Sequence, residues 1–159
     1  MTKFLLAVHV LAAIVAIGPV TVAASMFPPA ARRSLAAPQD ARAAETVRML
    51  HRICRVYAAV GVVVPVFGFA TARQMGVLGD AWLITSIVLT TVAAVVLGLL
   101  VLPGQERLTD AVDGDRDDQD GAGMRPATVR LAMVTGLFNL LWAAVTVLMI
   151  VRPGSTTGA

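Results

Sequence analysis

The sequence predicts an all-α fold, an integral membrane four-helix bundle, and three observations support this prediction. Of the 159 residues, 57% are hydrophobic and only 14% are charged, too little charge to cover the surface of a soluble domain. Four apolar runs are long enough to cross a hydrocarbon core of about 30 Å, which takes roughly 20 helical residues. An isolated strand in lipid would leave its backbone polar groups unpaired, so the runs are expected to be helices.

We expect one membrane domain that covers residues 1–159. The predicted membrane spans cover about residues 4–27, 53–72, 81–102 and 131–151. The single cysteine, Cys54, excludes an internal disulfide and a multi-cysteine metal site. The spans hold no Ser-His-Asp set and no carboxylate pair, so we assign no catalytic residue and no metal ligand. The expected partners are membrane lipid and a second copy or another membrane protein, and no nucleic acid.

An alternative interpretation of the first run is a cleaved signal peptide, in which Lys3 would form the basic n-region. Signal peptides have apolar regions of about 7–15 residues, and this run is longer, so we interpret it as a membrane helix. Pro28-Pro29 is predicted to end that helix. Residues 39–50 are predicted to form a short helix that leads into the second span, and Pro65 predicts a kink within that span.

Small residues and hydroxyl groups recur on one face of the later spans. In lipid, such residues mark where helix backbones approach one another, so we interpret these faces as packing surfaces. They comprise Ser86, Thr90, Ala94 and Gly98 in the third span, and Thr135, Gly136, Asn139 and Ala143 in the fourth.

Residues 104–126 form a predicted flexible acidic loop. The aspartates in it fail the EF-hand spacing, because counting from Asp113 places Asp118 where glycine is required and Met124 where glutamate is required. Repelling like charges without an apolar anchor predict disorder, and the tail 154–159 is also expected to be disordered.

The distribution of basic residues predicts that both termini lie outside the cell, N-out and C-out. Positively charged residues accumulate on the cytoplasmic side of a membrane protein. Only Lys3, Arg73 and Arg152 fall on the side of the termini. The opposite side holds Arg32, Arg33, Arg42, Arg48, Arg52, Arg55, Arg107, Arg116, Arg125 and Arg130. Heavy use of Ala, Val and Arg is typical of a bacterium, so we expect a multi-pass protein of the cytoplasmic (inner) membrane.

His9 is the candidate site residue, because an ionisable side chain inside a membrane is a functional hypothesis by default. At a rise of about 1.5 Å per residue, it lies roughly 7–8 Å below the outer edge of the core. Three roles fit: an axial haem ligand, a proton carrier, or a structural hydrogen bond to Thr85, Ser86 or Thr146. His51 lies about 20 Å deeper or more, so the two histidines of one chain cannot hold the same iron.

Several motifs resemble those of an uncharacterised family of predicted four-span bacterial integral membrane proteins. They are the sequence from Lys3 through His9 to Gly18-Pro19, the segments 51–57 and 79–82, and Phe138-Asn-Leu-Leu-Trp142. The layout is distantly similar to copper-resistance-D-type proteins and to membrane protoporphyrinogen oxidases. The latter resemblance implies haem b bound by a first-helix histidine, here His9, which a glycine follows about ten residues later, here Gly18.

The predicted function is therefore that of an integral membrane protein of unknown biochemical role, non-enzymatic or an accessory subunit. A haem-b-binding redox protein that uses His9 is the alternative. A small solute or metal channel, suggested by Asn139 and the hydroxyl groups of the third span, is the second alternative.

Overall fold

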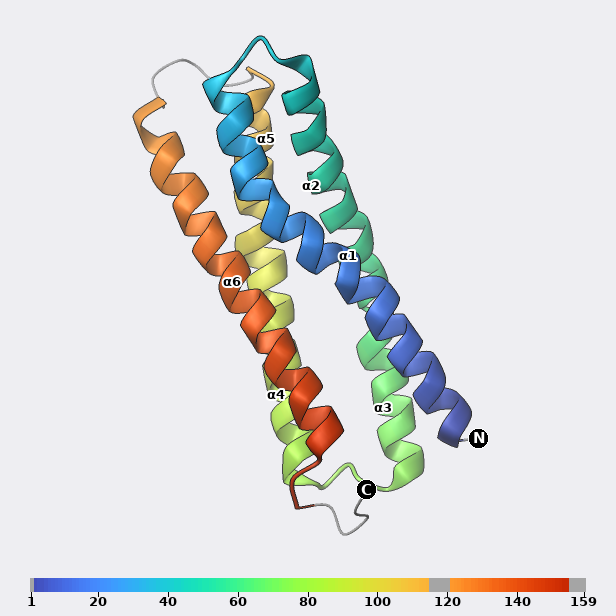
Figure 1. Ribbon diagram of the computed structural model, residues 1–159. Coiled ribbons are helices and arrows are strands. Elements are labelled where there is room, and N and C mark those ends of the chain that lie inside the picture. The colour runs from blue at the N-terminus through green and yellow to red at the C-terminus, as the bar shows by residue number, and fades with distance from the viewer. Residues whose placement is uncertain (1, 115–120, 155–159) are drawn as a thin grey trace.

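The computed structural model describes residues 2–114 and 121–154, and the regular elements in these ranges are all helices. Four helical rods lie side by side in an antiparallel bundle (Figure 1), so the predicted all-α fold is confirmed. The elements are α1 (Thr2–Ala36), α2 (Ala41–Gly61), α3 (Val63–Met75), α4 (Ala81–Val96), the π-helical η1 (Leu97–Val101), α5 (Leu102–Val112) and α6 (Gly121–Val151).

Each rod is long and apolar enough to cross a membrane. The four candidate spans are Lys3–Ala36, Ala41–Met75, Ala81–Val112 and Met124–Val151. The start of α1 and the end of α6 lie at one end of the bundle, beside the α3–α4 connection (Figure 1). The α1–α2 connection and the facing ends of α5 and α6 lie at the other, arginine-rich end.

The prediction that Pro28-Pro29 ends the first helix is wrong, because α1 continues through both prolines to Ala36. Proline has a helical φ, and its cost is the lost N–H donor and the steric conflict with the preceding turn. Packing offsets that cost here. Phe27 and Ala31 are fully buried in the main core, and Pro28 is buried with them. Tertiary contacts therefore extend the helix about two turns beyond the predicted span.

The predicted helix over residues 39–50 is confirmed as the first part of α2. The Asp40 carboxylate caps this helix and accepts hydrogen bonds from the backbone N–H groups of Arg42 at 3.0 Å and Ala43 at 3.2 Å. The rod breaks at Val62, where α2 gives way to α3. Pro65 cannot donate to the carbonyl of Gly61, so the predicted interruption is confirmed at this point.

The flexible loop predicted over residues 104–126 is wrong at both ends. α5 continues to Val112, and α6 begins at Gly121. Gln105 and Leu108 are buried on one face of α5, so packing rather than local charge decides the structure there. Arg48 of α2 forms an ion pair with Asp113 at the end of α5, at 2.7 Å. The other predicted loop aspartates from residue 115 to residue 120, and the tail from residue 155, lie outside the described residues.

The core is divided along the bundle axis. The main cluster joins α1, α2, α4, η1, α5 and α6 and includes Phe27, Cys54, Val101, Leu108 and Phe138. A smaller cluster near the termini joins Ala72 of α3 to Trp82 and Leu83 of α4. α1 packs against α2, α3 and α6, whereas α4 packs mainly against α6.

The packing ridge predicted for the third span is wrong in its second half. Ser86 is fully buried, but Ala94 and Gly98 are exposed. The buried residues of α4 and the first residue of η1 are instead Trp82, Leu83, Ser86, Ala93, Val96 and Leu97.

Candidate functional site

His9 lies on the face of α1 that packs against α3 and is 9% exposed. Its Nδ1 atom is 3.0 Å from the backbone carbonyl oxygen of Val64. A carbonyl oxygen only accepts hydrogen bonds, so Nδ1 carries the proton and donates. In the neutral imidazole, the lone pair then resides on Nε2, which has no hydrogen-bond partner among the described residues.

A glycine on α3 makes room for this histidine. A Cβ atom built at Gly68 would lie 2.8 Å from Cε1 of His9 and 3.2 Å from Nδ1. The first of these contacts is shorter than real Cβ atoms make and the second is tight, so the ring occupies the space that a side chain at residue 68 would fill. The close approach of α1 and α3 therefore depends on a glycine opposite the histidine.

The predicted partners of His9 are wrong. Thr85, Ser86 and Thr146 donate instead to the carbonyl oxygens of Ala81, Trp82 and Trp142, four residues earlier in their own helices. These short side chains satisfy themselves locally. The backbone of α3, next in space to α1, provides the acceptor for His9 in their place.

His51 belongs to a separate polar cluster in the main core. Its Nδ1 atom lies 3.2 Å from Oε1 of Gln105, and Nε2 of Gln105 donates to Sγ of Cys54 at 3.4 Å. The ring of Phe27 stands edge-on to that of His51, with centroids 6.4 Å apart. His9 contacts α3 and His51 contacts α5, and these helices lie at opposite ends of the bundle (Figure 1).

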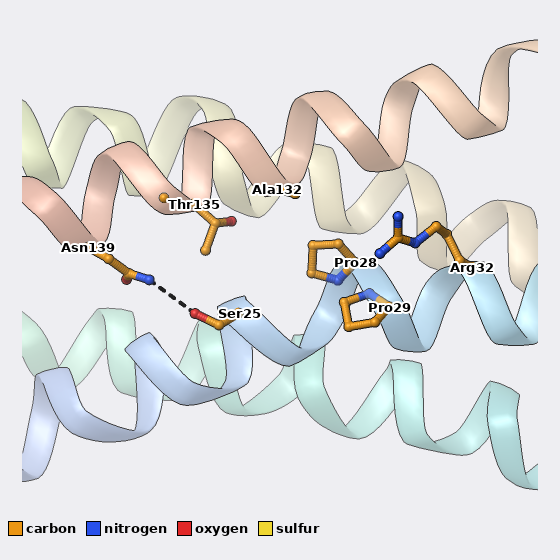
Figure 2. Close-up of a pocket in the computed structure, with 8 residues that line it drawn as sticks. Ser25, Pro28, Pro29, Arg32, Ala132, Thr135 and Asn139 are labelled. Atoms are coloured by element: carbon orange, nitrogen blue, oxygen red, sulfur yellow. Dashed lines mark hydrogen bonds between the residues drawn. The ribbon is translucent and has the colours of Figure 1, made fainter.

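A groove of about 340 Å³ opens between α1 and α6 (Figure 2). We call it the α1–α6 groove. It is lined by Ser25, Pro28, Pro29 and Arg32 of α1 and by Ala132, Thr135, Gly136 and Asn139 of α6. The Arg32 guanidinium extends along the groove toward Pro28, and the Asn139 amide meets Ser25 at the other end (Figure 2).

The hydrogen bonds in the groove fix the direction of the Asn139 amide. Ser25 donates its only hydroxyl proton to the carbonyl of Thr21, at 2.7 Å. Its Oγ atom can therefore only accept from Nδ2 of Asn139, at 3.0 Å. Oδ1 of Asn139 is buried and has no hydrogen-bond partner in the part of the chain that the structure describes, and the same holds for Oγ1 of Thr135, a residue that is 2% exposed.

Buried polar atoms without partners are rare in proteins and costly. Two of them, Thr135 Oγ1 and Asn139 Oδ1, belong to residues that line one groove here. The sequence had indicated Thr135, Gly136 and Asn139 as a packing face and Arg32 as a topology residue. Their convergence on one groove is a tertiary feature that the spacing alone did not reveal.

Metal binding and the channel interpretation gain no support from these residues. Within the described part of the chain, no three His, Cys, Asp or Glu side chains gather where they could hold a metal ion. Of the groups suggested for a channel, Asn139 bonds to Ser25 of α1, and Ser86 of α4 donates to the carbonyl of Trp82 in its own helix.

Comparison with known proteins identifies a family. No curated protein and no solved structure matches the chain, and nothing in the comparisons links it to copper-resistance-D-type proteins or protoporphyrinogen oxidases. One family model, described as a predicted integral membrane protein, matches residues 3–153. With its four membrane-length helices, the chain therefore belongs to the DUF2269 family of predicted integral membrane proteins.

Proposed function

We propose that this protein is a non-enzymatic, multi-pass protein of the bacterial cytoplasmic membrane that binds a lipid-derived ligand in the α1–α6 groove. The observation that carries this proposal is the pair of buried polar atoms without partners, Thr135 Oγ1 and Asn139 Oδ1, at the wall of an open groove. A ligand that pairs with them removes an energetic penalty that the unliganded protein bears.

The position of the groove indicates where its ligand comes from. The groove lies between two membrane-length helices, and its volume is within the range of small-molecule sites. Large apolar side chains on the same helices are more than half exposed, including Val22, Met26, Met133 and Leu140. In a bilayer these side chains contact acyl chains, so the groove opens toward lipid.

The proposed orientation places the arginine-rich end, and with it Arg32, in the cytoplasm. That leaflet is rich in anionic lipid, which basic residues at the membrane surface attract. A periplasmically active reporter fused after Ala159 is expected to be active. Activity of a cytoplasmic reporter alone at that position would reverse the orientation.

The experiment that tests groove binding is mass spectrometry of the intact protein, purified from its membrane in detergent. A Cβ atom added at Gly136 meets no atom within 4 Å, so the backbone can accept a leucine at this position. In Gly136→Leu, the leucine side chain is then expected to fill the groove. The wild type is expected to carry a bound molecule that Gly136→Leu lacks. Gly98→Leu is the matched control, because Gly98 also faces open space in a membrane helix but lies outside the groove.

Loss of the same bound molecule from both variants, or a wild-type protein with no bound molecule, would refute the proposed function. Thermal unfolding of each variant in the same detergent checks that the leucine has not unfolded the bundle.

A second candidate function, haem b binding, rests on the tautomer of His9. A histidine that ligates a metal usually donates its other ring nitrogen to a carbonyl or carboxylate, and His9 Nδ1 has such a bond to Val64. His9 would hold the haem iron through the Nε2 lone pair. His51 is engaged at the other end of the bundle, so a second ligand would come from a second copy of the chain. Bound haem would supply one-electron chemistry.

Absorption spectroscopy tests this candidate. Protein purified from haem-replete cells is expected to show a Soret band that His9→Ala abolishes and His51→Ala retains. A colourless wild-type protein, or a band unaffected by His9→Ala, would exclude His9 as a haem ligand.

A further inference from the structure

We infer that the ligand of the α1–α6 groove is a monoacyl glycerophospholipid, whose phosphate binds Arg32 and whose free glycerol hydroxyl binds Thr135 and Asn139. This inference rests on the proposed function and specifies the chemistry of the ligand. Three properties of the groove lead to it: an acceptor that needs a donor, an arginine that has no partner among the described residues, and the spacing between them.

The ligand needs a hydroxyl group because the side-chain carbonyl oxygen of Asn139 needs a hydrogen-bond donor. Its Oδ1 atom accepts only, and the bonds of Ser25 prevent the amide from turning over. Thr135 Oγ1 can both donate and accept. One ligand hydroxyl that donates to Asn139 and accepts from Thr135 would satisfy both atoms. The ester carbonyls of a diacyl lipid only accept, so they would leave Asn139 Oδ1 unpaired.

The ligand is expected to carry an anionic group because the positively charged side chain of Arg32 lines the groove. No hydrogen bond or ion pair joins Arg32 to another described residue, and its guanidinium extends along the groove toward Pro28 (Figure 2). A planar guanidinium binds phosphate through two parallel hydrogen bonds. Basic pockets between membrane helices on the cytoplasmic side are typical binding sites for phospholipid headgroups.

The spacing places phosphate and hydroxyl on one glycerol unit. Pro28 lies one helical turn below Arg32, about 6 Å, and the guanidinium extends in that direction. Asn139 bonds to Ser25, and Ser25 lies three residues from Pro28, about 4.5 Å along α1. The separation between the anionic site and the hydroxyl site is therefore about one turn or less, as between neighbouring positions of a phosphorylated glycerol. The acyl chain then extends over the exposed apolar surface of α1 and α6.

The inference is tested by titrating the detergent-purified protein with three probes and measuring bound mass. The probes are 1-oleoylglycerol 3-phosphate, its 2-deoxy analogue, which lacks only the hydroxyl, and dioleoylglycerol 3-phosphate. The wild type is expected to bind the first probe about 10-fold more tightly than the other two. The other two probes lack the free hydroxyl and leave Asn139 Oδ1 unpaired, and the loss of one buried hydrogen bond weakens binding by about that factor.

Three variants connect the probes to the residues. Asn139→Leu is expected to abolish the difference between the monoacyl probe and its deoxy analogue. Arg32→Gln is expected to weaken both by about 10-fold or more, whereas Arg33→Gln, an exposed neighbour that does not line the groove, leaves both unchanged.

Equal binding of the monoacyl and deoxy probes by the wild type, or equal losses in Arg32→Gln and Arg33→Gln, would overturn the inference. If Gly136→Leu still excludes whichever probe binds, groove binding stands and only the ligand chemistry is wrong. If Gly136→Leu changes the binding of no probe, the proposed function fails as well.

Discussion

Phe27→Ala is expected to lower the free energy of unfolding by about 3 kcal/mol, because it truncates one of the largest fully buried side chains of the core. Phe27 is fully buried in the main core, beside the His51 ring. Truncation leaves a cavity between helices. In lipid the packing contacts themselves hold helices together, so the loss of these contacts directly lowers the stability of the bundle. Unfolding by heat or by a denaturing detergent in mixed micelles measures the effect.

Phe69→Ala is the matched control, because Phe69 lies in α3 but is 57% exposed. That substitution is expected to change stability by less than about 0.5 kcal/mol, as for other surface sites. Similar losses in the two variants would contradict the placement of the core around Phe27.

Gly68→Ala is expected to displace His9 and to cost about 1–3 kcal/mol, the usual penalty of overpacking. The new methyl group would lie 2.8 Å from Cε1 of the ring, so the imidazole must move and its bond to the Val64 carbonyl is broken. Gly18→Ala is the control, because a Cβ atom there meets nothing within 4 Å. Thermal unfolding reports stability, and the nitrogen resonances of the His9 ring report the hydrogen bond.

The double variant His9→Ala/Gly68→Ala separates the steric conflict with His9 from any effect that replacing Gly68 has on the helix itself. Without the imidazole, the new methyl group has room, so the cost of Gly68→Ala is expected to be smaller in the His9→Ala background. Additive losses of stability would show that His9 and Gly68 do not contact each other as described.

The membrane spans could be predicted because the length and hydrophobicity of an apolar run are enough to identify a helix that crosses the hydrocarbon core. The helix ends could not, because they depend on packing. Pro28 and Pro29 stop an isolated helix, yet α1 passes through them where Phe27 and Ala31 are buried. The acidic segment likewise begins as helix α5, since Gln105 and Leu108 face the core.

The candidate site could be predicted only in part. His9 stood out as an ionisable residue in an apolar helix, but its partner depends on which helices are neighbours, and α1 lies beside α3. Thr135 and Asn139 carried a small-residue pattern that fits packing equally well. The unpaired state of Asn139 Oδ1 depends on where Ser25, on another helix, donates its proton, and no local pattern encodes this.

The most direct test of the account is photocrosslinking in the native membrane, with a photoreactive amino acid at residue 132 or at residue 133. Ala132 lines the α1–α6 groove, and Met133 is 70% exposed to lipid. Crosslinks at residue 132 are expected to be enriched in one phosphate-bearing, single-chain lipid, whereas those at residue 133 reflect the bulk membrane composition. The same lipid mixture at both positions would contradict the proposal that this groove is a binding site.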